Sequence, residues 1–426
     1  MRLCVHGLGY IGLATSSLFA NNGHEVIGYD IDEDVRDRLE RGEPDVAEAP
    51  FEAYVQRALD ASFRVSSEPV PAEYHVICVP TPYDRESEEA NLDYVESAAR
   101  AIGSLLRPDD VVIIESTVPP GTTTTVVAPL LARAGLTPSR DIGLGYVPET
   151  ILPGNTVTEL RSNDRILGGL DPASTEAIGT LYETVPTGTL RAAPDATTAE
   201  FAKLVQNAFR DVNIAYANTL ALVAEDYGID VREAIDLANT HPRVDILDPG
   251  PGVGGHCLPV DPHFLGQGSD ETDLVDTARE VNDHMPDHVL DLLAAELDTL
   301  RGKTVAVLGV AYKGNVSDTR NSPGLAIARE LGAATSEAVS LADGGWREVD
   351  VRLCDPHVTD PDLDLVPVTE ALDCADAAVL TAAHDEFADL DPQMVRSLLD
   401  EQVVVDPLSV VDADAWTDQG ISLVTL

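Results

Sequence analysis

Short apolar runs alternate with longer amphipathic segments through roughly the first 190 residues. The runs at 2–6, 25–29, 75–79 and 111–115 are rich in Val, Ile, Leu and Cys, which is typical of parallel strands buried on both faces. Helical periodicity fills the segments between them. This part of the chain therefore predicts an α/β domain with a doubly wound parallel sheet.

The period changes near residue 193. One long helix is expected over about 196–227, with Thr197 or Thr198 as N-cap, and two more helices near 230–240 and 270–298. A strand at 304–308 restarts the α/β alternation, which continues through runs at 351–354, 376–381 and 402–405, while 343–345 and 359–364 are expected to be surface loops. We predict two Rossmann-like doubly wound domains joined by a central helical domain, with limits at 1–192, 193–298 and 299–426.

The formal charge of −47 changes the picture of the surface. Because the acidic residues are spread along the whole chain, we interpret them as a solvated surface suited to high salt, where charge is screened over a few Å. Repulsion from phosphates argues against a nucleic-acid partner. No apolar run approaches a membrane span, and the N-terminus enters a strand without a leader, so we expect a cytoplasmic protein. Five scattered cysteines argue against a disulfide framework or a metal site.

A glycine-rich loop follows the first strand. Residues 7–12 read GLGYIG and open a helix, so Gly7, Gly9, Tyr10, Ile11 and Gly12 are expected at a pyrophosphate. Asp30 ends the next strand, where a carboxylate would bind the ribose of NAD and repel the extra phosphate of NADP. The alternative is a glycine turn with another ligand.

Two threonines follow later strands. Thr81 and Thr117 lie where ligands bind in an open parallel sheet, so their hydroxyls are candidates for the cofactor. The alternative is that each threonine is an ordinary turn residue without a ligand.

The segment 250–262, GPGVGGHCLPVDP, places Cys257 in a loop rich in glycine and proline, with Asp261 four residues later. Such loops expose reactive groups, and a thiolate is a competent nucleophile. The other four cysteines fall in or beside strand-like segments and are expected in the core. Since hydride transfer alone needs no thiol, Cys257 indicates chemistry at the aldehyde level.

The long helix carries a narrow polar stripe. Lys203, Asn207 and Arg210 share one face, and most of their neighbours are apolar. A ligand-facing wall on an otherwise buried helix is our interpretation; a structural ion-pair stripe is the alternative.

These motifs together resemble the UDP-glucose/GDP-mannose dehydrogenase family, over essentially the whole chain. The similar segments are GLGYIG, PTP (80–82), ESTVPPGT (115–122), YVPE (146–149), EFAKLVQN (200–207), GGHCLPVDP (254–262) and GVAYK (309–313) with DTRNSP (318–323). The resemblance implies oxidation of a sugar C6 alcohol to a carboxylate with two NAD. It also implies a UDP-sugar-binding C-terminal domain and a homodimer or higher homo-oligomer formed through the central domain.

Within the family the chain is most similar to the branch that oxidises UDP-N-acetyl-D-mannosamine, through FRDVNIA (209–215), LANTHPRV (237–244) and His256. UDP-glucose or UDP-N-acetylglucosamine is the alternative substrate. The branch usually has an arginine where Thr150 stands, and residues 405–409 also depart from its pattern. A non-catalytic sugar-binding protein and a two-electron dehydrogenase that stops at the aldehyde are further alternatives.

The resemblance also implies roles for single residues. Cys257 would attack the aldehyde, Lys203 and Asn207 would stabilise the oxyanion, and Asp261 and Glu149 would steer water and protons. The remaining residues implied to bind ligands are Thr150, Ile151, Arg210, His241, Arg243, Gly254, Tyr312 and Lys313 for the sugar, with Arg243 supplied by a neighbouring subunit, and Arg320 for the cofactor pyrophosphate.

Overall fold

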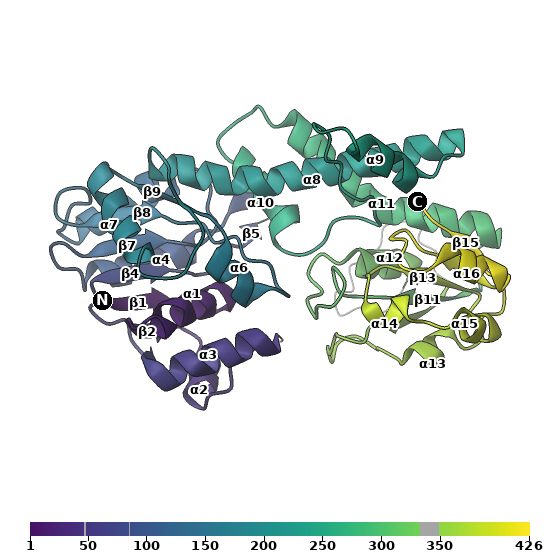
Figure 1. Ribbon diagram of the computed structural model, residues 1–426, viewed down its shortest axis with the longest axis horizontal. Helices are drawn as coiled ribbons and strands as arrows, with labels where there is room; N and C mark the ends of the chain where they lie inside the picture. The colour runs from purple at the N-terminus through teal and green to yellow at the C-terminus, as the bar shows by residue number, and fades with distance from the viewer. Residues whose placement is uncertain (47, 85, 333–348) are drawn as a thin grey trace. The chain divides into compact units, whose positions relative to one another are not determined.

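The computed structural model describes residues 1–46, 48–84, 86–332 and 349–426 (Figure 1). Its contacts divide the chain into two compact units. The N-terminal unit comprises Met1–Gln206 and His263–Asp270, and the C-terminal unit comprises Asn207–Pro262 and Glu271–Leu426. Helices α8 (Ala196–Tyr227) and α10 (Cys257–Gly266) contribute residues to both. The predicted three-domain limits stay a prediction, and the expected loop at 343–345 lies outside the described residues.

An eight-stranded sheet organises the N-terminal unit, in the order β10-β9-β8-β7-β4-β1-β2-β3. Its strands are β1 (Arg2–His6), β2 (Glu25–Tyr29), β3 (Phe63–Ser66), β4 (Tyr74–Ile77), β7 (Val111–Ile114), β8 (Gly143–Tyr146), β9 (Arg165–Gly169) and β10 (Leu190–Ala192). The strands from β3 to β8 in this order are parallel, whereas β9 runs antiparallel to β8. The four predicted strands are confirmed, and the order with β1 inside is doubly wound.

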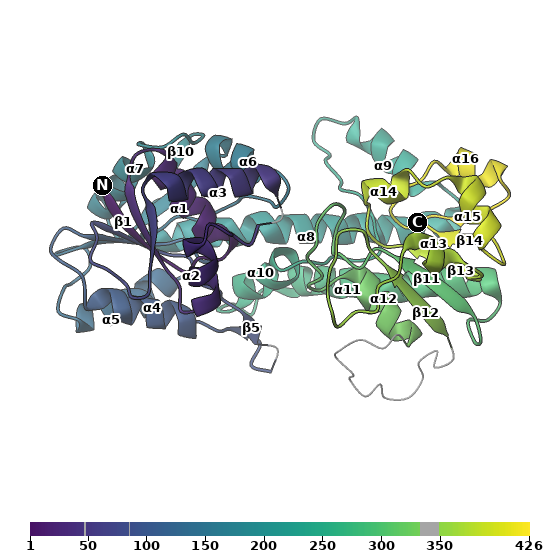
Figure 2. The ribbon, with the colours of Figure 1, turned by 90° about the horizontal axis from the view of Figure 1, so that it is seen from below.

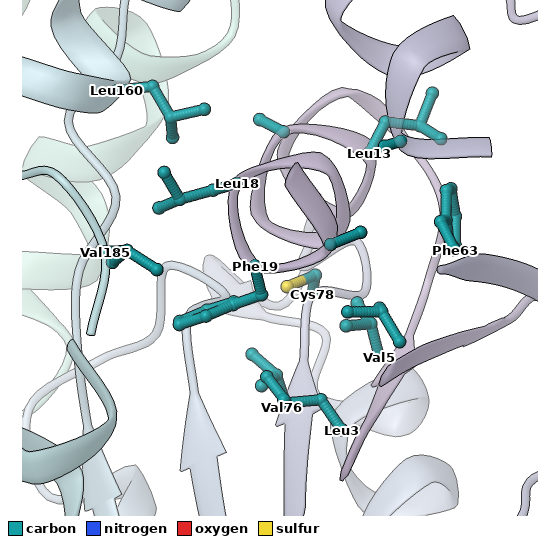
Figure 3. Close-up of a cluster of buried hydrophobic side chains, with 14 of the residues drawn as sticks. Leu3, Val5, Leu13, Leu18, Phe19, Phe63, Val76, Cys78, Leu160 and Val185 are labelled. Atoms are coloured by element: carbon teal, nitrogen blue, oxygen red, sulfur yellow. The ribbon is translucent and has the colours of Figure 1, made fainter. Parts of the chain in front are cut away.

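Helices cover both faces of this sheet (Figure 2). They are α1 (Tyr10–Asn21), α2 (Glu33–Glu40), α3 (Ala49–Ala61), α4 (Asp93–Gly103), a π-helical turn η1 (Thr123–Val127) leading into α5 (Ala128–Arg133), α6 (Thr156–Ser162) and α7 (Pro172–Tyr182); β5 (Tyr83–Asp84) and β6 (Glu89–Ala90) form a separate antiparallel pair. Side chains alternate between the faces. Leu3, Val5 and Val76 face Leu18 and Phe19 of α1 in one core (Figure 3), and α4, α5 and the start of α8 cover the other.

A five-stranded parallel sheet organises the C-terminal unit, in the order β12-β11-β13-β14-β15. Its strands are β11 (Thr304–Leu308), β12 (Asp350–Cys354), β13 (Ala377–Leu380), β14 (Val403–Val405) and β15 (Ser422–Val424). Helices α11 (Asp273–Leu297) and α12 (Pro323–Leu331) pack on one face, and α13 (Val368–Leu372), α14 (Asp385–Ala388), α15 (Pro392–Leu398) and α16 (Ala413–Asp418) on the other. Helix α9 (Val231–Asn239) packs on α8. The expected pair of doubly wound domains is confirmed.

Both sheets contain the same local arrangement. The backbone N–H of Leu8 donates to the Asp30 carboxylate at 2.7 Å. In the second sheet, the N–H groups of Val310 and Ala311 donate to Asp355 at 2.8 and 2.9 Å. In each case an aspartate at the end of the second strand fixes the loop that leaves the first strand. The second unit therefore repeats the loop support of the first.

Two local predictions were wrong. The N-cap of α8 is not a threonine, because the Asp195 carboxylate accepts the Thr198 N–H at 2.7 Å before the first turn. Cys4, Cys78 and Cys354 are buried as expected, but Cys374 is exposed and has a left-handed backbone with φ of 56°, so it belongs to a turn. Among the described helices, none is long and apolar enough to cross a membrane.

Candidate active site

The three glycines after β1 meet different surroundings. Gly7 has φ of +92°, and a Cβ there would lie 2.5 Å from the Cys78 carbonyl oxygen. A Cβ on Gly12 would lie 1.9 Å from the Gly7 oxygen, so only glycine allows α1 to pack this closely on the loop after β1. A Cβ on Gly9 would meet no atom within 4 Å. The open backbone at Gly9, the residue before α1, fits a pyrophosphate at a helix N-terminus.

Asp30 is set by the polypeptide around it. One carboxylate oxygen accepts the Leu8 N–H at 2.7 Å and the other accepts the Asp32 N–H at 2.9 Å. Arg36 donates to the Asp30 carbonyl oxygen at 2.6 Å. The half-buried carboxylate has the chemistry to accept ribose hydroxyls, so the residues present fit NAD.

The two predicted threonines are brought together. The Thr81 hydroxyl donates to the Thr117 carbonyl oxygen at 2.7 Å, joining the loops that follow β4 and β7. This bond gives Thr81 a structural role at the carboxyl edge of the sheet. Contact of either threonine with the cofactor stays a prediction.

The remaining two residues of the glycine loop, Tyr10 and Ile11, begin α1 and pack against the core. The Tyr10 hydroxyl bonds to Glu48 and to Thr156, and therefore ties this loop to distant parts of the chain.

Glu149 follows β8 and is buried with Arg165 of β9. Their side chains are each 3% exposed and their charged atoms lie 2.7 Å apart. The other Glu149 oxygen accepts the N–H groups of Thr150 and Ile151 at 2.7 and 3.2 Å. Because these amides are already engaged, any contact of Thr150 or Ile151 with a sugar would use other atoms.

A second carboxylate lies in the same buried region. Glu115 accepts hydrogen bonds from Thr15 at 2.6 Å, from the Cys78 thiol at 3.3 Å and from the Tyr182 hydroxyl. Burial raises the pKa of Glu115, and the nearby Glu149 charge raises it further. No periodic pattern along the chain marks this cluster, because its members come from separate elements.

Two residues of the polar stripe of α8 are buried, whereas three of the large apolar residues beside them are exposed. Lys203 and Asn207 are each 8% exposed. By contrast, Phe201, Val205 and Phe209 are 50%, 40% and 59% exposed. The expected sidedness of an otherwise buried helix was therefore wrong: the ligand-type side chains are covered, and an apolar stripe lies at the surface.

Cys257 is the first residue of helix α10, not a loop residue as expected. It is exposed, and Asp261, one turn later, is 2% exposed. Asn207 donates to the Asp261 carboxylate at 2.6 Å and thereby anchors the helix that carries the thiol. A helix N-terminus favours the thiolate form of a cysteine.

The glycines before the thiol pack on the residues after β11. A Cβ on Gly254 would lie 2.8 Å from the Tyr312 Cβ, and Gly255 donates to the Arg320 carbonyl oxygen at 2.8 Å. Burial raises the pKa of Tyr312, with smaller contributions from the charges of Asp318 and Cys257. The C-terminal unit thus brings together Asn207, Arg210, Gly254, Cys257, Asp261, Tyr312, Lys313 and Arg320, of which Lys313 lies 6.0 Å from the Tyr312 ring centre.

Three predicted ligand-binding residues lie in an exposed loop or are already paired with another side chain. His241 and Arg243 lie in the exposed loop after α9, with 3.5 Å between their side-chain nitrogens. The Arg320 guanidinium is paired with Asp318 at 2.6 Å, a partner that the motif did not identify. Binding of these residues to sugar or cofactor stays a prediction.

Comparison with known proteins decides the family. Residues 1–186, 197–284 and 306–413 match the NAD-binding, central and UDP-binding domains of the UDP-glucose/GDP-mannose dehydrogenase family. The chain belongs to this dehydrogenase family. As a member of the UDP-glucose/GDP-mannose dehydrogenases, it is an NAD-dependent enzyme acting on nucleotide sugars.

Three relatives within the family illustrate the similarity. The UDP-N-acetyl-D-mannosamine dehydrogenase of Methanocaldococcus jannaschii is 38% identical, covering 100% of this chain and 96% of its own length. The NDP-N-acetyl-D-galactosaminuronic acid dehydrogenase of Ralstonia nicotianae is 38% identical, covering 95% of each chain. The solved UDP-D-ManNAc dehydrogenase of Pyrococcus horikoshii has a TM-score of 0.90 and 35% identity, covering 100% of this chain and 99% of its own.

Proposed function

We propose that the enzyme oxidises the C6 hydroxyl of UDP-N-acetyl-D-mannosamine to a carboxylate, giving UDP-N-acetyl-D-mannosaminuronate. The observation that carries this proposal is the exposed thiol of Cys257 at the start of α10, one turn from an aspartate held by Asn207. The Methanocaldococcus and Pyrococcus relatives named for this sugar support the choice of substrate.

The proposed reaction transfers four electrons and passes through two covalent intermediates on Cys257. NAD, held by the glycine loop and Asp30, would supply the hydride acceptor for each of two oxidations. After the first, the Cys257 thiolate adds to the C6 aldehyde and forms a thiohemiacetal. Loss of the second hydride gives a thioester, and water then releases the carboxylate and the thiol. One sugar therefore yields two NADH.

Four further predicted residues have the chemistry for these steps. Asn207 and Lys203 are donors for the C6 oxyanion, and removal of one such donor typically costs about 10²–10³ in rate. Asp261 and Glu149 are acceptors for the protons of the alcohol and the attacking water. We assign the sugar and nucleotide to Thr150, Ile151, Arg210, His241, Arg243, Gly254, Tyr312 and Lys313, and the cofactor pyrophosphate to the glycine loop with Arg320.

The test is NADH production with purified enzyme and UDP-N-acetyl-D-mannosamine. We expect two NADH per sugar, and Cys257→Ala should remove the second NADH and most of the turnover. Cys374→Ala is the matched control, because Cys374 is also exposed but belongs to a turn beside α13. One NADH per sugar from the wild type, together with full activity of Cys257→Ala, would overturn the mechanism.

A second candidate substrate is a nucleotide-linked N-acetylgalactosamine derivative. It is favoured by the Ralstonia relative, which is named for N-acetyl-D-galactosaminuronic acid. The same assay with UDP-glucose, UDP-N-acetylglucosamine and UDP-N-acetylgalactosamine ranks the sugars by kcat/KM. Turnover of one of these without turnover of UDP-N-acetyl-D-mannosamine would reassign the substrate.

We also propose a homodimer formed through α8. Phe209, Tyr216, Val223 and Tyr227 follow helical spacing and are 59%, 53%, 47% and 75% exposed, which makes one apolar stripe. Light scattering should give a dimer for the wild type and a monomer for Phe209→Glu/Tyr216→Glu. We further propose that the enzyme works in the cytoplasm, where nucleotide sugars are made, and cell fractionation tests this location. The acidic composition suits a high salt concentration.

A further inference from the structure

We propose that Glu48 is a positioning residue that couples the cofactor loop to the loop that follows Glu149. This inference rests on the proposed function, in which Thr150 and Ile151 of the loop after Glu149 bind the sugar. Glu48 precedes α3, and no motif of the sequence singled it out.

Four hydrogen bonds converge on the Glu48 carboxylate. One oxygen accepts from the Tyr10 hydroxyl at 2.6 Å, from the Gly154 N–H at 2.6 Å and from the Thr156 hydroxyl at 2.5 Å. The other oxygen accepts the Thr156 N–H at 3.2 Å. The donors come from two segments that are more than 140 residues apart in sequence and belong to the same unit.

The donors to Glu48 lie in two loops at which ligands are expected to bind. Tyr10 lies between the open Gly9 and the buried Gly12, in the loop that fits the pyrophosphate. Gly154 has φ of +105° and lies at the exposed end of the 149–156 loop. The Glu48 carboxylate and the direct bond between the Tyr10 and Thr156 hydroxyls therefore join both loops at the carboxyl edge of the sheet, where ligands bind in doubly wound folds.

The chemistry of the bridge requires an acceptor-only group. Four donors point at two oxygens, and charge-assisted hydrogen bonds to a carboxylate are stronger than neutral ones. Glutamine would turn one donor-facing oxygen into an NH₂ group and would keep part of the bridge. The Tyr10 hydroxyl links the two loops, because Tyr10→Phe removes its bonds to Glu48 and Thr156. The same variant leaves the bonds of Glu48 to Gly154 and Thr156 in place.

Coupling between the cofactor loop and the sugar loop can be measured through the affinity for NADH. If each ligand orders its own loop, and the bridge joins the loops, then binding of one ligand tightens the other by the same factor. NADH and UDP-N-acetyl-D-mannosamine form a complex that cannot react, so the factor is measurable as the ratio of NADH dissociation constants without and with saturating sugar. We expect about fivefold or more in the wild type, within the usual range of coupled sites.

The variants separate the outcomes. Tyr10→Phe and Glu48→Ala should bring the ratio below about twofold, Glu48→Gln should be intermediate, and the exposed Glu52→Gln should match the wild type. A purely structural role would lower the melting temperature and leave the ratio unchanged. A wild-type ratio of one, or an unchanged ratio in Tyr10→Phe, would overturn the coupling.

Failure of the proposed substrate is distinguishable from failure of the coupling. If UDP-N-acetyl-D-mannosamine neither turns over nor changes the NADH titration, the proposed function fails. The ratio is then measured with the UDP-sugar that does turn over, and the same limits decide the role of Glu48.

Discussion

Replacing Arg165 with methionine tests whether the buried ion pair holds the N-terminal unit together. Methionine keeps most of the apolar length of arginine but removes the cation that lies 2.7 Å from Glu149. Both side chains are 3% exposed, so water cannot replace the lost partner. Removing one member of a buried pair typically costs about 3–5 kcal/mol, which is a large part of a typical stability of about 5–15 kcal/mol.

The control is Arg191→Met on the neighbouring strand. Arg191 pairs with Asp164 at 2.6 Å, but these side chains are 64% and 43% exposed, so the expected loss is below about 1 kcal/mol. Urea denaturation in molar KCl gives the overall loss. Hydrogen exchange of the β8 and β9 amides reports on this unit alone.

The effect of Arg165→Met should depend on pH. A buried carboxylate without its cation has a folded pKa above the unfolded value of about 4.3. Such a group costs nothing while it is protonated below the unfolded pKa, and it costs more as pH rises through the folded pKa. The loss should therefore be larger at pH 8 than at pH 5, and Glu149→Gln added to Arg165→Met should recover part of it. Equal losses for Arg165→Met and Arg191→Met would refute the reasoning.

The glycine loop, the acidic surface and a buried histidine pair give three further predictions. Gly9→Ala should weaken NAD binding at unchanged melting temperature, whereas Gly12→Ala should destabilise the fold; equal melting temperatures would contradict the distances of a Cβ to its neighbours. The melting temperature should fall on transfer from molar to millimolar KCl, because screening is lost, and an unchanged value would exclude the proposed role of salt. Burial lowers the pKa of His6 to about 3 and of His75 to about 4, so both rings are neutral in the folded protein and their contribution to stability is lost as pH falls below the unfolded pKa of about 6.5. His75→Phe should reduce this loss by up to about 1.4 kcal/mol per pH unit between pH 6 and 4, and identical urea midpoints for wild type and variant across that range would speak against it.

The sequence predicted those elements whose signal is periodic. The strands around the glycine loop and the 32-residue helix α8 follow directly from their apolar spacing. Helix α10 was missed because Pro259 and Pro262 are helix breakers, although Pro259 lies in the first turn, where its missing N–H has no helical partner. Periodicity also identifies which residues share a face without saying which face is covered, and this explains the error over Phe209.

Long-range polar contacts carried no such signal. Glu48 bonds to residues more than 100 positions away, and the Arg165–Glu149 pair joins β9 to the loop after β8, two strands whose pairing the pattern did not predict. A glutamate just before a helix ordinarily faces solvent, so its position in the sequence does not indicate a buried or bridging role. Only the fold shows which acids meet several donors.

The aspartate at the end of the second strand limits how coenzyme preference can be redesigned. Deleting the Asp30 carboxylate to admit a 2′-phosphorylated coenzyme would also remove the acceptor for the Leu8 N–H. Weak binding of the new coenzyme would then not distinguish its rejection from disorder of the glycine loop. Asparagine keeps an acceptor oxygen without the charge and is the better starting substitution. The same exchange at Asp355, which supports the corresponding turn in the second sheet, measures the cost of the lost support by itself.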